Sequence, residues 1–167
     1  MLFISMLPIV ELRGALPVAY LHYHYSLPKA YILSVLGNMV PIPFLLKFFP
    51  RVERLLRRYR RWERFFDSLF SRTRRKAAGK IERYEKLGVM VFVAIPLPVT
   101  GAWTGTLVAY LFGIESTSAL LYILLGVLIA GVIVLVITLS GPLYGAIGIV
   151  LLVVAAYFTG ILGEKGG

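Results

Sequence analysis

Residues 8–17 read PIVELRGALP, and this stretch decides the class of protein. It places Glu11 and Arg13 between two prolines, Pro8 and Pro17, in an otherwise apolar N-terminal region. An ionisable side chain at membrane depth costs about 3 kcal/mol, so it is rarely incidental. Proline interrupts helical hydrogen bonding, and interrupted backbone is tolerated there only where protein or a wet cavity covers it. The stretch therefore predicts two half-helices around a turn, a re-entrant hairpin, with a site at its tip.

The composition places the chain among membrane proteins. It has 167 residues, 59% of them hydrophobic, and a mean hydropathy of +0.82, which is too apolar for a soluble domain of this size. It contains no cysteine, which excludes disulfides and thiolate metal sites. Residues 47–86 hold 15 of the 18 Lys and Arg and 5 of the 8 Asp and Glu, so they carry the whole net charge of +10. By the positive-inside rule this segment faces the cytoplasm.

The apolar runs predict an all-α, polytopic membrane protein with one membrane domain. We expect a first repeat over 1–49, a basic amphipathic connector over 50–86, a second repeat over 87–139, and a last transmembrane helix and tail over 140–167. Spanning helices are predicted at 28–49, 118–139 and 143–162. The first contains Gly37, Asn38, Pro41 and Pro43, which predict a kink. Ser116 or Thr117 is expected to cap the second.

The connector is charged but periodic. Apolar residues such as Trp62, Phe66 and Leu69 recur at three- and four-residue steps, which indicates a helix. A basic helix with an aromatic face is expected to lie on anionic lipids. Nucleic-acid binding is the alternative for an arginine-rich segment, but the periodic apolar face argues against it, and no nucleic-acid partner is expected.

A shift of 90 residues aligns the two halves of the chain. Leu7-Pro8 falls on Leu97-Pro98, and VAYL at 18–21 falls on VAYL at 108–111. With the connector in the cytoplasm, the first hairpin enters from outside and the second from the cytoplasm, so the repeats are inverted. Their tips meet near the midplane, where such transporters place substrates. The last helix then returns the C-terminus to the cytoplasm, making the chain a multi-pass cell-membrane protein.

The motifs ELRGALP and PLPVTGAWTG resemble those of the small multidrug export protein family. That family is similar at the level of the fold to the DedA superfamily, which has paired re-entrant hairpins and roles in moving lipids or lipid carriers. The resemblance extends from Pro8 to about Leu162. It implies export or translocation across a membrane.

The first hairpin carries the two ionisable candidates. Glu11 is predicted to be a protonatable coupling group. Arg13 is predicted to bind an anionic headgroup, because the planar guanidinium bonds two oxygens at once. The alternative is an internal ion pair between them that pins the hairpin.

The second hairpin carries polar and small residues. Thr100, Trp103 and Thr104 are predicted to line a polar cavity, with Trp103 able to stack on a substrate. Gly101 and Gly105 have a spacing that favours close helix packing instead, and both interpretations stand. Asn38 is a weaker candidate, expected to bond to broken backbone nearby. The residues expected to shape the hairpin backbones are Pro8, Gly14, Pro17, Pro96, Pro98, Gly101 and Gly105.

No metal site, cofactor or enzyme activity is predicted. His22 and His24 alternate without a third ligand, and an interfacial aromatic cluster with Tyr20, Tyr23 and Tyr25 is the better interpretation. No hydrolase triad or phosphate-cradling loop is present in the sequence, and few ionisable residues lie outside the connector.

The predicted function is therefore a secondary transporter or exporter of small amphipathic molecules, coupled to protons. A DedA-like translocase of a phosphorylated lipid or lipid carrier is the first alternative, and a non-transporting membrane scaffold is the second. Small residues on the last two spans would suit a homodimer, although internal packing explains them equally. These residues are Gly126, Ala130, Gly141, Gly145 and Gly148.

Overall fold

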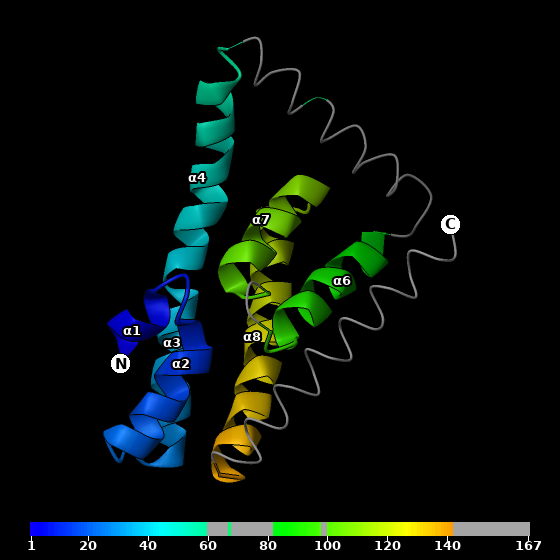
Figure 1. The fold of residues 1–167 in the computed structure, drawn as a ribbon. Helices are drawn as coiled ribbons and strands as arrows, with labels where there is room; N and C mark the ends of the chain where they lie inside the picture. The colour runs from blue at the N-terminus through cyan, green and yellow to red at the C-terminus, as the bar shows by residue number, and fades with distance from the viewer. Residues whose placement is uncertain (60–66, 68–81, 98–99, 142–167) are drawn as a thin grey trace, which may run out of the picture.

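The structure is a computed structural model that describes residues 1–59, 67, 82–97 and 100–141 (Figure 1). All regular elements in these residues are helical. They are α1 (Leu2–Met6), α2 (Glu11–Pro17), the π-helical turn η1 (Val18–His22), α3 (Leu27–Met39), α4 (Pro41–Leu56), α6 (Glu82–Ala94), α7 (Ala102–Phe112) and α8 (Ser116–Leu139). The predicted span at 143–162, most of the connector, and Pro98 lie outside the described residues.

Two long helical segments are long and apolar enough to cross a membrane. One is α3 and α4 together, Leu27–Leu56, with 30 residues, and the other is α8, with 24. They run in opposite directions: the chain enters α3 at the end of the bundle where it leaves α8 (Figure 1). The helix predicted at 118–139 is confirmed, with its start two residues earlier, at Ser116.

The first long segment differs from its prediction at its end. It was predicted to stop at residue 49, but α4 continues to Leu56. Hydropathy falls after Pro50, yet Glu53 and Arg57 form an i,i+4 ion pair of 2.6 Å, which supports a helix outside the apolar run. At Val40, between α3 and α4, the backbone stays helical and the Val40 N–H bonds Leu36 O at 3.1 Å. The kink expected from Gly37, Asn38, Pro41 and Pro43 stays a prediction.

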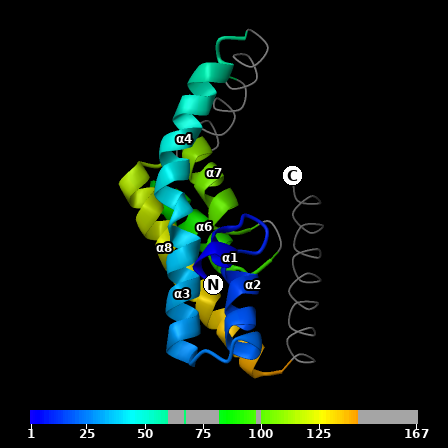
Figure 2. The ribbon, with the colours of Figure 1, turned by 90° about the vertical axis from the view of Figure 1, so that its left-hand side faces the viewer.

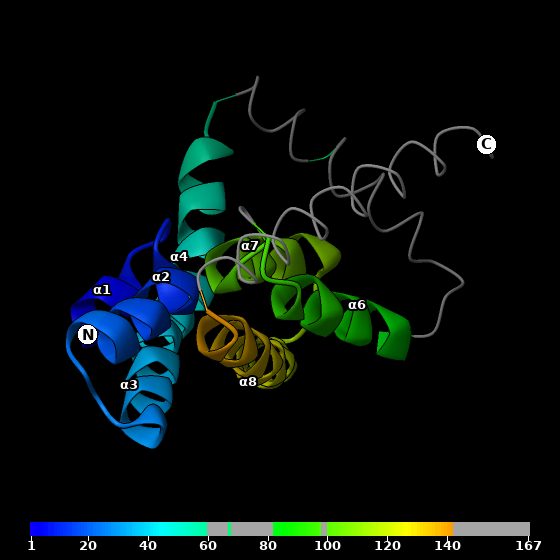
Figure 3. The ribbon, with the colours of Figure 1, turned by 60° about the horizontal axis from the view of Figure 1, so that its bottom comes forward.

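Two pairs of short helices pack beside these long segments. The first pair is α1 and α2, separated by residues 7–10, and the second is α6 and α7, separated by residues 95–101. Helix α1 packs on α3 as α6 packs on α8, while α2 contacts α8 and α7 contacts α4. The pairs lie on opposite flanks of the bundle in Figure 3, and α2 and α7 occupy opposite halves of its length in Figure 2.

The first pair corrects the role predicted for Pro17. Pro17 was expected to interrupt the helix, but it is the last residue of α2, and the chain continues directly into η1. Proline removes one N–H, and the next donor, Val18 N–H, bonds the carbonyls of Gly14 and Ala15. The break therefore lies only on the Pro8 side, where Glu11 has a φ of 48°.

The predicted cap of α8 is also wrong. The helix includes Ser116, and its N-cap is Glu115, with no side-chain capping bond. Because the helix begins before Thr117, neither hydroxyl is in the capping position.

The core explains part of the small-residue pattern on α8. Leu12, Ile42 and Ile123 are fully buried at the centre of the bundle. At Gly126 a Cβ would lie 2.7 Å from Met90 O, so this glycine allows α6 to approach α8 closely. Internal packing thus accounts for Gly126, while Gly145 and Gly148 lie outside the described residues, and the homodimer stays a prediction.

Candidate functional site at the two helix breaks

Glu11 connects the first helix pair to the start of α7. Its Oε1 accepts a hydrogen bond from the Trp103 N–H at 3.4 Å, and the Ala102 N–H also bonds the carboxylate. The first N–H groups of a helix have no intrahelical partner and carry partial positive charge. Glu11, a residue of α2 that is only 4% exposed, therefore accepts hydrogen bonds from the free N–H groups at the N-terminus of α7.

Arg13 donates hydrogen bonds to backbone carbonyl groups directly after the end of α6. Its guanidinium donates to the carbonyl oxygens of Leu97 and Ile95, the latter at 3.2 Å, and to Thr100 Oγ1 at 3.1 Å. These acceptors lie in the chain between α6 and α7, immediately after the last turn of α6. Carbonyl groups at a helix C-terminus carry partial negative charge and favour a cation.

The two charges therefore do not form the ion pair that the sequence left open. No ion pair of 4.0 Å or less joins Glu11 and Arg13, whereas Arg57 forms such pairs with Glu53 and Asp67. Glu11 instead bonds the positive N-terminus of α7, and Arg13 bonds carbonyl groups at the negative C-terminal end of α6. The site predicted at PIVELRGALP is thus also the contact that joins the two halves of the chain.

The glycines of the second pair allow this contact. A Cβ at Gly101 would overlap the Glu11 carboxylate, and one at Gly105 would overlap the side chain of Val93 on α6. Trp103 Nε1 donates to Met6 O at 3.2 Å, at the end of α1. These contacts support the close packing predicted from the Gly101 and Gly105 spacing.

Two cavities, of about 640 Å³ and about 530 Å³, lie among the described residues. The second lies between the breaks of the two helix pairs and is lined by Pro8, Ile9, Val10, Glu11, Arg13, Gly14, Pro96, Gly101, Trp103 and Thr104. It unites most of the predicted site, including both charged groups. Thr100 contacts Arg13 without lining this cavity.

Asn38 lies on the other side of Glu11. It is buried, and its Oδ1 accepts no hydrogen bond, so the bond with nearby backbone that was expected for Asn38 is not formed at this oxygen. With Glu11, Arg13 and Gly101 it lines a void of about 10 Å³. That volume approaches what one water molecule occupies.

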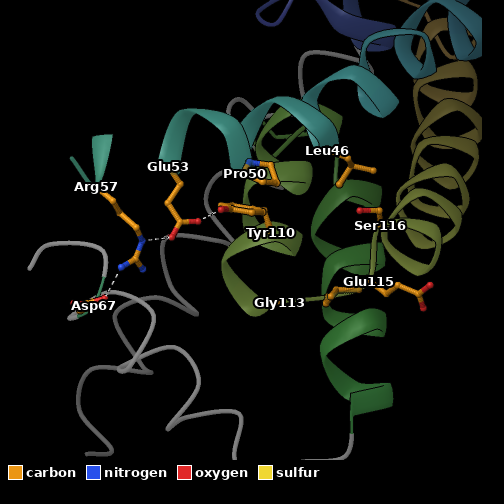
Figure 4. A pocket seen from close by; sticks show the side chains of 10 residues that line it. Leu46, Pro50, Glu53, Arg57, Asp67, Tyr110, Gly113, Glu115 and Ser116 are labelled. Atoms are coloured by element: carbon orange, nitrogen blue, oxygen red, sulfur yellow. Dashed lines mark hydrogen bonds and ion pairs between the residues drawn. The ribbon is translucent and has the colours of Figure 1, made fainter. Parts of the chain in front are cut away.

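The cavity of about 640 Å³ lies at the far end of α4 and was not predicted (Figure 4). Glu53 lies between two partners there: it accepts hydrogen bonds from Tyr110 of α7 and from Arg57 at 2.6 Å. Arg57 also bonds Asp67 at 2.7 Å. The hydrogen bond that Arg57 donates to Glu53, and then the one that it donates to Asp67, raise the pKa of Arg57. The i,i+4 spacing could have revealed the Glu53–Arg57 pair, but no local pattern reveals Tyr110.

Part of the predicted aromatic cluster forms: the ring contacts there involve His22, Tyr23 and Tyr25, but neither includes Tyr20. His22 and Tyr23 pack edge to face at 5.1 Å, Tyr23 and Tyr25 lie 6.0 Å apart, and Lys29 Nζ lies 4.3 Å from the centre of the Tyr25 ring. The described residues contain no group of three metal-ligating side chains.

These features define a helical membrane protein. Charged side chains of its first half bond the backbone groups at the break between α6 and α7 in its second half. The chain belongs to a family described as "Putative small multi-drug export protein", whose profile matches residues 11–133. The match begins at Glu11, directly after the first break, and ends inside α8, so it includes the second break. No curated protein and no solved structure matches the chain.

Proposed function

We propose that the protein is a secondary transporter that exports small amphipathic molecules and is coupled to protons through Glu11. The observation that carries this proposal is a buried carboxylate in the wall of a cavity of about 530 Å³ between two broken helices. The cavity has an apolar wall of Pro8, Ile9 and Val10 and a polar wall that includes Thr104. Such a lining suits a molecule with both an apolar and a polar part.

Protonation of Glu11 is the proposed coupling step. The ionised carboxylate accepts charge-assisted hydrogen bonds from the N-terminus of α7, and these are roughly twice as strong as neutral ones. A proton on Glu11 removes the charge and weakens this hold, so the two helix pairs can separate. Protonation of Glu11 therefore favours the separated state of the two helix pairs, and the ionised carboxylate favours the joined state.

An inverted repeat with two re-entrant hairpins supplies the moving parts. The shift of 90 residues places Glu11 on Gly101, and these two residues lie against each other. Contact between equivalent residues is what a two-fold axis produces. The packing of α2 on α8 and of α7 on α4 has the same symmetry. Rocking one half against the other around a central site is the usual motion of such repeats.

Arg13 receives a positioning role in this proposal instead of the predicted role in binding an anion. Its guanidinium already donates to two carbonyls and a hydroxyl of residues 95–100. It holds the end of α6 while Glu11 titrates. The substrate is therefore recognised by the cavity wall and by the charge state of Glu11.

The test is flux in proteoliposomes with an imposed proton gradient, using Glu11→Gln. The amide oxygen still accepts the Trp103 N–H, so the protein should fold, but gradient-driven flux should fall to background because the proton site is gone. Glu115→Gln is the matched control, since Glu115 is an exposed carboxylate outside the cavity. Wild-type gradient-driven flux in Glu11→Gln would contradict proton coupling at this residue. A thermal melt separates loss of coupling from loss of folding.

Two further arms address the other predicted functions. Competition by a polyprenyl phosphate, without competition by cationic amphiphiles, would favour a translocase of phosphorylated lipids. Wild-type behaviour after replacement of both Glu11 and Arg13 would favour a scaffold.

A further inference from the structure

A groove outside the central cavity runs along α4 from Trp103 to a group of arginines. Its apolar part has a volume of about 390 Å³ and is lined by Met6, Val40, Pro41, Phe44, Leu45, Phe48, Arg51 and Trp103. A cleft of about 180 Å³ follows, lined by Arg51, Arg54, Leu55 and Arg58. Because Arg51 lines both, the apolar and basic parts form one continuous surface.

The apolar part suits a hydrocarbon chain. Phe44 and Phe48 are 71% and 55% exposed on its wall, a large amount of apolar surface for two neighbouring side chains. Val40 and Arg51 are separated by about three helical turns, or about 16 Å. That is close to half of a hydrocarbon core of about 30 Å, so the groove is one leaflet deep.

The basic part suits a phosphate group. Arg51, Arg54 and Arg58 are exposed, and none has an acidic partner among the described residues. Arg57, in the same stretch, is instead held by Glu53 and Asp67. The cleft thus gathers guanidinium groups that form no ion pair with the acidic residues the structure describes, and the guanidinium fork matches phosphate oxygens.

We propose that this groove binds one anionic phospholipid, with an acyl chain along Phe44 and Phe48 and the phosphate at Arg51, Arg54 and Arg58. The charge at one end and the leaflet-deep apolar wall together select this ligand over a neutral lipid. Basic residues at the end of a span contact the anionic cytoplasmic leaflet. The site is separate from the proposed transport cavity, and the two share only the Trp103 side chain.

Trp103 can report occupancy of the groove directly. In the full chain with Trp62→Phe, Trp103 is the sole tryptophan. This protein is reconstituted in vesicles of phosphatidylcholine and phosphatidylglycerol at one fixed ratio, with bromine on the acyl chains of either lipid. We expect brominated phosphatidylglycerol to quench Trp103 about fivefold more effectively, because each nearby basic residue attracts anionic lipid. The triple variant Arg51→Gln, Arg54→Gln, Arg58→Gln should abolish this preference.

A matched pair of single variants separates a site from general charge attraction. Arg54→Gln and Arg57→Gln remove the same charge from the same stretch, but only Arg54 lines the cleft. The proposal requires the stronger quenching of Trp103 by brominated phosphatidylglycerol to decrease in Arg54→Gln and to persist in Arg57→Gln. It is overturned if both variants fall equally, if the triple variant keeps the preference, or if both brominated lipids quench the wild-type protein equally. Because the readout is binding, its failure is distinct from a failure of proton-coupled flux.

Discussion

At the residue scale, Glu11 complements the partial positive charge at the N-terminus of α7, and Arg13 complements the partial negative charge at the C-terminus of α6. Each helix end carries roughly half an elementary charge, and each side chain brings the opposite sign to it. The sequence identified both residues, because charges between prolines in an apolar stretch are unusual. It could not identify their partners, which lie more than 80 positions away in the chain.

Replacement of Gly101 by alanine tests the contact with Glu11. The new Cβ would overlap the buried carboxylate, and overpacking of this kind costs about 1–3 kcal/mol. We expect the free energy of unfolding in detergent micelles to fall by that amount, as measured by denaturant titration followed by circular dichroism.

Gly88→Ala is the control for this substitution. Gly88 lies inside α6, and a Cβ added there would have open space for 4 Å around it, so alanine should be neutral or stabilise by up to about 1 kcal/mol. Equal destabilisation by both substitutions would show that the Glu11 contact is not responsible.

At the scale of elements, hydropathy predicted the helices in apolar parts of the chain. It failed where hydrogen bonds and ion pairs determine where a helix ends. It located α8, but it ended the first span before Glu53 and Arg57, which continue α4 as an ion pair. The prolines, in turn, predicted a break at Pro17, although η1 follows without interruption. Hydropathy reports the solvent that a segment prefers, and neither feature depends on that preference.

Arg13→Lys tests how the end of α6 is held. Lysine keeps the charge but lacks the planar fork that reaches Ile95, Leu97 and Thr100 together. With hydrogen bonds to charged groups worth about 1.5–3 kcal/mol each, we expect a loss of about 2 kcal/mol in the free energy of unfolding. Arg54→Lys, at an exposed arginine without an acidic partner among the described residues, should change it by less than about 0.5 kcal/mol. Full stability of Arg13→Lys would show that charge alone holds this helix end.

At the scale of the whole molecule, side chains join the halves at three levels along the bundle. Glu11 and Arg13 join them at the helix breaks, Tyr31 donates to Leu128 O at 2.8 Å between α3 and α8, and Tyr110 donates to Glu53 between α7 and α4. The 90-residue alignment predicted that the halves correspond. The inverted arrangement stays a proposal, supported by the contact of Glu11 with Gly101.

A double-mutant cycle with Glu53→Gln and Tyr110→Phe tests the third of these connections. A part-buried hydrogen bond to a carboxylate predicts a coupling energy of about 1–2 kcal/mol in the free energy of unfolding. Tyr31→Phe combined with Glu53→Gln is the comparison cycle, and these two substitutions should be additive within about 0.5 kcal/mol. Additivity in the first cycle would contradict a connection through this bond.

The second half of the chain depends on side chains of the first half, which is synthesised earlier. The carboxylate and guanidinium that satisfy the break between α6 and α7 belong to residues 11 and 13, which leave the ribosome long before that break is synthesised. The first helix pair can therefore already be in the bilayer when the second arrives with exposed amides and carbonyls. Synthesis from the N-terminus thus delivers the partners before the groups that need them, and the order of the two halves along the chain protects the second half during its insertion.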